Sequence, residues 1–426
     1  MATNVVQAAD QTAIPPPPLR RNLRFQTLWI GMATSTFGVA VANIAYPLMI
    51  LAITGSPAKA GLFGSVQAIA MLAAGLPTGS LADRHDSRTI VIIVEACRVM
   101  VTIAVVMALV YGWLSFPILL VAAVLLGIGQ AVKSATGTLL VRQVVPPEQL
   151  TRALTQDEVR LNGAAIAGPA IGGALYAIHV LAHAVPFMVT AGLFLVSLLT
   201  AVLMRILPSP ASEDPHEPGS AEKAKSATSG GMLVGVRMLW AHPVLRTATL
   251  LIMGMNTIGA GLELIIIVIL RHQAVSSEFI GLALGVGAAG GLAGAPLIKP
   301  LHRLRPGVLL LLVCALDVVM LTLLALPFGP WWVAALLFTV MLGLPAMRVL
   351  IDILVIRQAP PEQRGRTIAA LMTLFGLGTP IGLAGAGLLL QHLPGWSATL
   401  VVAALEAAVV IYCATKRELW RATWPS

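Results

Sequence analysis

Eight ionisable side chains lie inside long apolar runs of this 426-residue chain, where an unpaired charge is costly. They are Glu95, Arg98, Lys133, Glu263, Asp317, Arg348, Asp352 and Glu406. Groups in such places either neutralise one another or bind and release protons. The i,i+3 spacing of Glu95 and Arg98 and the i,i+4 spacing of Arg348 and Asp352 favour pairing on one helix face, so both interpretations stay open.

Glu263 has no oppositely charged neighbour on its own helix, which makes it the first candidate for a proton-binding carboxyl. A salt bridge to another helix is the alternative. Asp352 and then Asp317 are the next candidates.

Lys133 and Arg348 lie 215 residues apart, at matching places in the two halves of the chain. We expect both to face a shared cavity and to favour a substrate with an anionic or strongly electronegative group. Pairing of Arg348 with Asp352, and of Lys133 with a carbonyl or phosphate, is the alternative. Further candidates for the cavity are the polar residues Asn43, Tyr46, Asn162 and Asn256. Each of these also suits a hydrogen bond between helices.

The motifs of common enzyme sites are absent. The three cysteines lie in apolar runs and suit packing better than a disulfide or metal site. The chain has no G-x-x-x-x-G-K-S/T motif and no loop long enough for an ATPase domain. We therefore expect no enzyme activity, no metal and no cofactor, with energy supplied by a proton gradient or by the gradient of the substrate.

These side chains must be positioned by membrane-spanning helices. Apolar residues make up 58% of the chain and charged residues 11%, which indicates a polytopic membrane protein. The expected spans are 27–53, 60–81, 89–112, 116–141, 158–180, 184–206, 244–270, 278–298, 307–327, 331–356, 366–391 and 395–415. Each of these twelve runs is long enough to cross a bilayer core of about 30 Å.

The distribution of positive charge predicts the orientation of the chain. If both termini are cytoplasmic, 22 of the 27 Lys and Arg residues fall in cytoplasmic segments, three lie within spans and only Lys59 and Arg271 fall on the other side. The net charge of +9 is thus explained by membrane orientation, without a nucleic-acid partner. We expect a multi-pass protein of the cytoplasmic (inner) membrane.

The domain boundaries follow from the same pattern. We expect a disordered tail over 1–24, six helices over 25–206, a cytoplasmic linker over 207–243, six helices over 244–415 and a tail over 416–426. The linker ends in a short amphipathic stretch, Gly231 to His242, that suits the membrane interface. The two halves repeat, because Leu140–Gln149 matches Val355–Gln363 with one residue deleted.

A charged decapeptide, Gly79-Ser-Leu-Ala-Asp-Arg-His-Asp-Ser-Arg88, joins the second and third spans. It resembles the G-x-L-A-D-R-x-x-R-R signature of major facilitator superfamily (MFS) transporters, with Ser87 where arginine is usual. The resemblance implies twelve transmembrane helices in two pseudo-symmetric six-helix bundles, with the substrate site between them. It also implies a conformational role for Gly79, Asp83, Arg84 and Arg88. We expect Asp83 to face the start of the eleventh span, near Arg366 and Thr367.

The fifth span contains Gly163-Ala-Ala-Ile-Ala-Gly-Pro-Ala-Ile-Gly-Gly173. It resembles the G-x-x-x-G-P-x-x-G-G motif of MFS antiporters, which points to Gly168, Pro169, Gly172 and Gly173; generic close packing of small residues is the alternative. The run Gly235–Arg246 resembles the lead into the seventh helix of exporters related to macrolide efflux proteins and the enterobactin exporter.

These resemblances imply a proton-coupled exporter of a small, partly apolar organic compound such as a drug, antibiotic, siderophore or secondary metabolite. An MFS importer or a lysophospholipid flippase of the same fold is the alternative. The expected partners are the bilayer and a small-molecule substrate, and the expected state is a monomer. In this fold helices 1, 4, 7 and 10 line the cavity, which implies structural roles for Glu95, Arg98, Asp317 and Glu406. Related exporters often carry an acidic residue after Ser-x-x-Gly of helix 1. Here Val39 occupies that position, which favours Glu263 as the proton-coupling residue.

Overall fold

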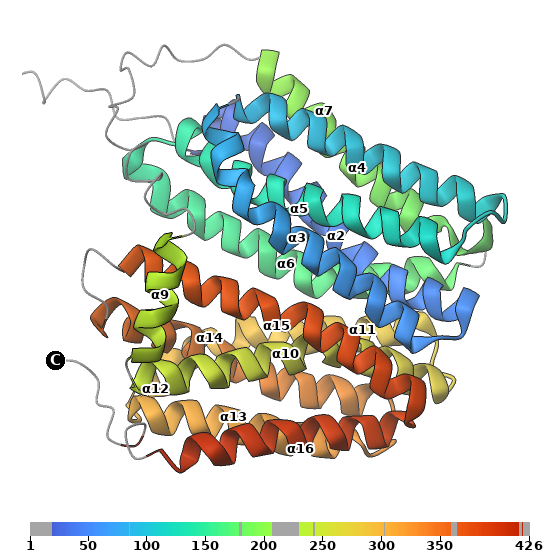
Figure 1. The fold of residues 1–426 in the computed structure, drawn as a ribbon. Coiled ribbons are helices and arrows are strands. Elements are labelled where there is room, and N and C mark those ends of the chain that lie inside the picture. The colour runs from blue at the N-terminus through green and yellow to red at the C-terminus, as the bar shows by residue number, and fades with distance from the viewer. Residues whose placement is uncertain are drawn as a thin grey trace, which may run out of the picture.

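The computed structural model describes residues 19–84, 86–178, 181–206, 230–241, 243–301, 303–358, 364–416 and 420. This part of the chain is almost entirely helical and contains no strand. Figure 1 shows two bundles of long helices, with the first half of the chain above and the second half below.

Six long helices form the N-terminal bundle: α2 (Leu23–Thr54), α3 (Pro57–Arg84), α4 (Ser87–Val110), α5 (Phe116–Val144), α6 (Leu150–Ala177) and α7 (Val185–Ile206). Six more form the C-terminal bundle: α10 (Pro243–His272), α11 (Ser277–Gly294), α13 (Pro306–Leu324), α14 (Pro330–Gln358), α15 (Arg364–His392) and α16 (Gly395–Ala414). The short elements are η1 (Leu19–Arg21), η2 (Pro147–Gln149), η3 (Leu181–His183), α9 (Gly230–Ala241), η4 (Ala295–Leu297) and α12 (Ile298–Leu301).

Local sequence determines where several of these helices begin and end. Asn22 caps α2 by accepting a hydrogen bond from the Phe25 backbone N–H at 3.1 Å. Asp86 caps α4 in the same way through the N–H of Arg88, at 3.3 Å. Gly55 ends α2 in the left-handed conformation, at φ 62°, which glycine adopts without strain.

Eleven of the long helices are apolar enough over a sufficient length to cross a membrane. The remaining one, α6, has 28 residues and lies among them, but its first half carries Arg152, Asp157, Glu158 and Arg160. Twelve long helices therefore occupy the twelve expected spans, and the predicted all-helical membrane fold is confirmed.

Two pairs of helices make the most extensive contacts across the boundary between the bundles. Helix α3 packs against α15, and α6 packs against α11. Helices α4 and α7 lie on the outer side of one bundle and α13 and α16 on the outer side of the other (Figure 1). The helices that carry Glu95, Asp317 and Glu406 are thus peripheral, as expected.

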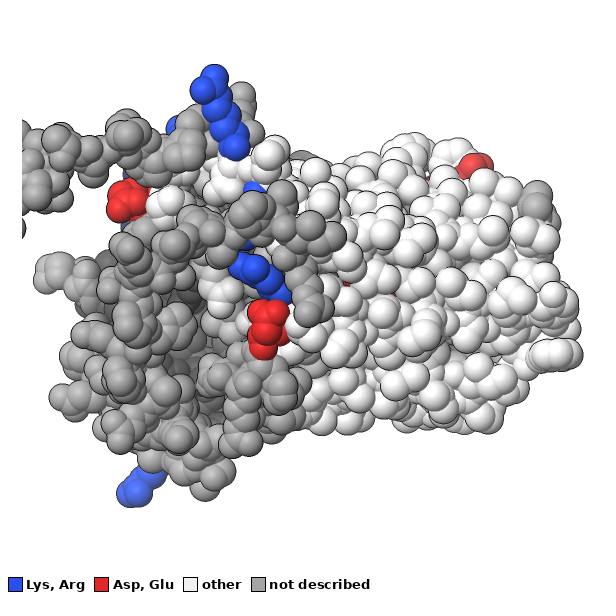
Figure 2. Space-filling model, turned by 90° about the horizontal axis from the view of Figure 1, so that it is seen from above, with Lys and Arg blue, Asp and Glu red and all other residues white. Residues whose placement is uncertain are grey.

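The surface agrees with a membrane belt. Figure 2 shows Lys, Arg, Asp and Glu of this face gathered mainly toward one end, with a long uncharged surface beside them. The short helix α9 is not only interfacial, because it packs against α15 and α10 and its Leu239 is fully buried.

The last residues of the expected tail, 1–24, belong to the folded part of the described chain. Leu19 is buried there and α2 already begins at Leu23. The linker residues 207–229 and most of the tail after residue 416 lie outside the described residues.

Candidate functional site

The two bundles meet most closely where glycines replace larger side chains. A Cβ on Gly61 of α3 would run into the Leu383 carbonyl and lie 2.9 Å from the Gly387 Cα of α15. A Cβ on Gly173 of α6 would run into the Ser277 carbonyl and lie 3.0 Å from the Gly281 Cα of α11. Both crossings bring backbone against backbone, so even one methyl group has no room.

Three hydrogen bonds cross between the bundles in the same half of the molecule. Ser56 donates to the Gln391 side-chain oxygen at 2.7 Å, and buried Ser65 donates to the Pro380 carbonyl at 2.9 Å. Arg271 donates to the Leu48 carbonyl at 3.1 Å. We call this end, marked by the α2–α3 turn, the sealed end.

Glycines toward the other end have no such neighbours. A Cβ on Gly75 of α3 or on Gly163 of α6 would meet no atom of another part of the described chain within 4 Å. The two bundles are therefore locked together at the sealed end, and the same helices lack this contact farther along.

The glycine-proline motif of α6 has two packing faces. Gly168 and Gly172 lie against α2, where a Cβ on Gly172 would be 2.5 Å from the Ile44 side chain. The Pro169 carbonyl and Gly173 instead lie against Gly281 of α11, across the bundle boundary. The motif thus takes part both in packing within the N-terminal bundle and in the seal between the two bundles.

The loop motif after the second span is described only in part. Arg88 lies in the first turn of α4 and lines a cavity inside the N-terminal bundle. The surroundings of Gly79 and the side chains of Asp83, Arg84 and Arg366 lie outside what the structure describes. The contact expected between Asp83 and the start of α15 stays a prediction.

Glu263 lies on α10 and is partly buried. Nearby Gly261 packs so closely against α15 that a Cβ there would lie 2.7 Å from the Gly382 carbonyl. Within the described part of the chain, Glu263 has no hydrogen bond or ion pair. The alternative, a salt bridge to another helix, is thus not seen there, and the side chain of Asp352 lies outside the described residues.

The four polar cavity candidates differ in environment. Asn256 donates to the Phe375 carbonyl and to Thr379 of α15, at 2.6 and 3.2 Å, and Asn162 donates to the Glu158 carbonyl of its own helix. Tyr46 is buried between two phenylalanine rings. Asn43 alone of the four is exposed, so it keeps its place as a substrate candidate.

Lys133 departs from our expectation. Its ammonium forms an ion pair with Glu95 of α4 and donates to Ser197 of α7 at 2.6 Å, and its side chain is almost fully buried. It therefore lies inside the N-terminal bundle and does not face the space between the bundles. Arg348 is exposed on α14, so the pseudo-symmetric pair does not form one anion site.

The contacts of Lys133 belong to a larger polar cluster. Arg98 lies 3.5 Å from Glu95, confirming the i,i+3 pair, and donates to Ser35 and Gln130 at 2.8 and 3.2 Å. Its guanidinium also covers the Phe194 ring at 4.0 Å. Sequence spacing revealed the Glu95–Arg98 pair but not Lys133, whose partners lie on other helices.

A second buried cluster lies in the C-terminal bundle. Asp317 of α13 and Glu406 of α16 are buried on two helices that pack against each other. Both oxygens of Glu406 and one of Asp317 have no donor among the described residues. Ionised carboxylates only accept hydrogen bonds, so a hydrogen bond between these two requires a shared proton.

Comparisons with known proteins identify the family to which this architecture belongs. The profile described as Major Facilitator Superfamily matches residues 28–382. The chain belongs to this superfamily.

Relatives within the MFS include drug exporters at low identity. The multidrug efflux pump Tap of Mycolicibacterium fortuitum is 26% identical over 413 residues, which cover 92% of this chain and 96% of that protein. Macrolide efflux protein A of Streptococcus pyogenes is 27% identical over 158 residues, covering 37% of this chain and 38% of that protein.

Solved structures show the same MFS fold. A bacterial homologue of the human lysosomal transporter Spinster, in an inward-facing, unoccupied conformation, has a TM-score of 0.67 at 16% identity, over 96% of this chain and 97% of that one. The nucleoside transporter NupG has a TM-score of 0.68 at 10% identity, over 94% of this chain and 99% of that one. The chain is thus an MFS transporter of the membrane and not an enzyme.

Proposed function

We propose that this MFS transporter exports small, partly apolar organic compounds in exchange for protons, by alternating access. The observation that carries the proposal is the two-faced α6 motif, in which Gly173 and the Pro169 carbonyl hold α11 at the sealed end. A seal made of backbone contacts opens and closes as a unit, as alternating access between two bundles requires. The names of the relatives Tap and macrolide efflux protein A support export.

The direction of transport follows from the expected orientation. With both termini cytoplasmic, the sealed end is extracytoplasmic and the described state is closed to that side. The likeness to an inward-facing structure supports this assignment. Substrate would then enter from the cytoplasm or inner leaflet and leave when the seal opens.

Glu263 is our first candidate for the coupled proton. A partly buried carboxyl without a partner among the described residues must be neutral, or paired, whenever it is shielded from water. Facing outward it would take a proton from the acidic side, and facing inward it would release that proton as substrate binds. Export would thereby draw its energy from the proton gradient.

The test uses everted membrane vesicles from a strain that lacks its own efflux pumps, with ethidium as the probe. Wild-type protein should concentrate ethidium in the lumen when a proton gradient is imposed, and an uncoupler should abolish the accumulation. Glu263→Gln keeps the shape of the protonated side chain. It should lose concentrative uptake but keep ethidium counterflow in proteoliposomes.

Glu278→Gln is the matched control, because Glu278 is an exposed carboxyl at the start of α11. It should behave as wild type. If proton flux measured through the Glu263→Gln protein equals that of wild type, Asp352 and then Asp317 become the candidates for the coupled carboxyl. If uptake by the wild-type protein does not depend on the proton gradient, proton-coupled export is refuted.

A further inference from the structure

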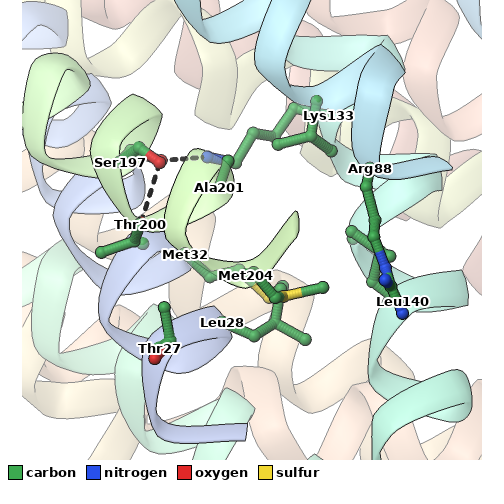
Figure 3. A pocket seen from close by; sticks show the side chains of 13 residues that line it. Thr27, Leu28, Met32, Arg88, Lys133, Leu140, Ser197, Thr200, Ala201 and Met204 are labelled. Carbon is green, nitrogen blue, oxygen red and sulfur yellow. Dashed lines mark hydrogen bonds between the residues drawn. The ribbon is translucent and has the colours of Figure 1, made fainter. Parts of the chain in front are cut away.

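A cavity reaches the buried Lys133 cluster from one end of the N-terminal bundle. It lies between α2, α4, α5 and α7, is partly open to solvent and has a volume of about 20 Å³, enough for one water molecule. Figure 3 shows Lys133 reaching across this cavity to Ser197, with Arg88 on the facing wall. Thr27, near the start of α2, lines its outer part. The cavity therefore connects the Lys133 ammonium with the end of the bundle opposite the sealed end.

A second cavity touches the other side of the cluster. It has a volume of about 20 Å³ and is lined by Arg98 and Gln130 of the cluster together with exposed Asn43. Between the two cavities the polar atoms are continuous, since Lys133 and Ser197 contact Glu95 and Glu95 contacts Arg98. The cavities on both sides leave room for water next to the buried ions. A purely structural ion pair would not need such water.

The charges of the cluster do not balance. Arg98 stays protonated in proteins, so it already compensates the single carboxylate of Glu95. A charged Lys133 then leaves one excess positive charge in a nearly fully buried place. The charged and titratable groups around it are Arg88, Glu95 and Arg98 of α4, Asp157 and Arg160 of α6, and Tyr46 of α2.

The remaining neighbours do not correct the imbalance. Arg160 adds a positive charge that acts on Lys133, and the carboxylate of Asp157 is already taken by Arg160 at 2.5 Å. Loss of one proton from the Lys133 ammonium removes the excess charge. The neutral amine keeps two N–H donors for Glu95 and Ser197, so both hydrogen bonds survive the change.

We propose that Lys133 is a proton-exchange site inside the N-terminal bundle: its ammonium gives a proton to water in the adjoining cavity, leaving a neutral amine, and later takes one back. The site deepens the proposed proton-coupled export by adding a second titrating group, remote from Glu263. The exchange itself needs neither substrate nor transport, so it is measured separately from them.

The first experiment measures which lysines are neutral and open to water. The full-length protein is treated with acetic anhydride from about pH 6 to 12, and acetylation of each lysine is quantified by peptide mass spectrometry, because only the neutral amine reacts. Exposed Lys59 and Lys299 are internal standards. Half-maximal acetylation of Lys133 should come about two pH units below theirs. Acetylation of Lys133 at the same pH as Lys299, or none while Lys299 reacts, would overturn the proposal.

The second experiment separates proton exchange from a structural role. Lys133→Arg keeps the charge and the Glu95 contact but holds its proton permanently. It should slow gradient-driven ethidium transport at least about tenfold while ethidium counterflow and protein yield persist, and Lys299→Arg should change neither. A Lys133→Arg protein with wild-type gradient-driven transport would identify Lys133 as a structural ion-pair partner. If wild type shows no proton coupling, the proposed function fails and acetylation still decides whether Lys133 exchanges its proton.

Discussion

Gly173→Ala should open the sealed end. The added methyl group would collide with the Ser277 carbonyl and lie 3.0 and 3.1 Å from backbone atoms of Gly281. Because these are backbone atoms of a packed helix, they cannot move aside as a flexible side chain can. Separation of α6 and α11 relieves the collision, so the substitution penalises the sealed state specifically.

The size of the effect follows from the cost of overpacking. Inserting a methyl group into a well-packed contact costs about 1–3 kcal/mol. A penalty of that size confined to one of two states shifts their ratio by about 5- to 150-fold. A transporter that rests mostly sealed should then populate the state open at this end to a measurable fraction.

The assay is a pulsed electron–electron distance measurement across the seal in lipid nanodiscs. Spin labels at exposed Lys59 and Ser276 report on the N- and C-terminal bundles, respectively. Gly173→Ala should add a longer-distance population. Gly163→Ala is the matched control on the same helix, where a methyl group meets no other part of the described chain within 4 Å. Identical distance distributions for Gly173→Ala and wild type would refute the reasoning.

Three further outcomes are expected. Asp83→Asn should impair ethidium export at normal protein level, because the expected helix-dipole contact is worth up to about 2 kcal/mol; normal export would contradict it. Arg348→Ala should weaken export of anionic fluorescein more than of cationic ethidium, since exposed Arg348 is the remaining candidate of the pair for an anion site, and equal loss would argue against that site. Glu406→Gln should keep thermal stability in detergent, because its amide can donate to Asp317 in place of a protonated carboxyl; a fall above about 2 °C, roughly 2 kcal/mol for a chain of this length, would contradict a shared proton.

Helices and their order were predictable because their signals are local. Apolar length marks eleven of the twelve, while the expected span 158–180 misses the charged first turns of α6, which begins at Leu150. The Glu95–Arg98 contact was equally predictable, because it depends only on a spacing of three within one helix.

The partner of Lys133 could not be predicted, because it depends on which faces of α4, α5 and α7 meet. The repeat matched Lys133 with Arg348 by position along the chain, yet one is buried and the other exposed. A repeat conserves the place of a residue along its helix. Its partners come from neighbouring helices, whose sequences differ between the halves.

The two halves therefore hold opposite charge at corresponding places. The third, fourth and sixth helices of the first half contribute Glu95, Arg98, Lys133 and Ser197, in which the cations outnumber the acids. The third and sixth helices of the second half bring Asp317 and Glu406 together, with no donor to Glu406 among the described residues. Neutralising the first cluster requires loss of one proton, and satisfying the second requires one to be held. Because both described cavities adjoin the first cluster, we expect Lys133 to exchange its proton with water quickly.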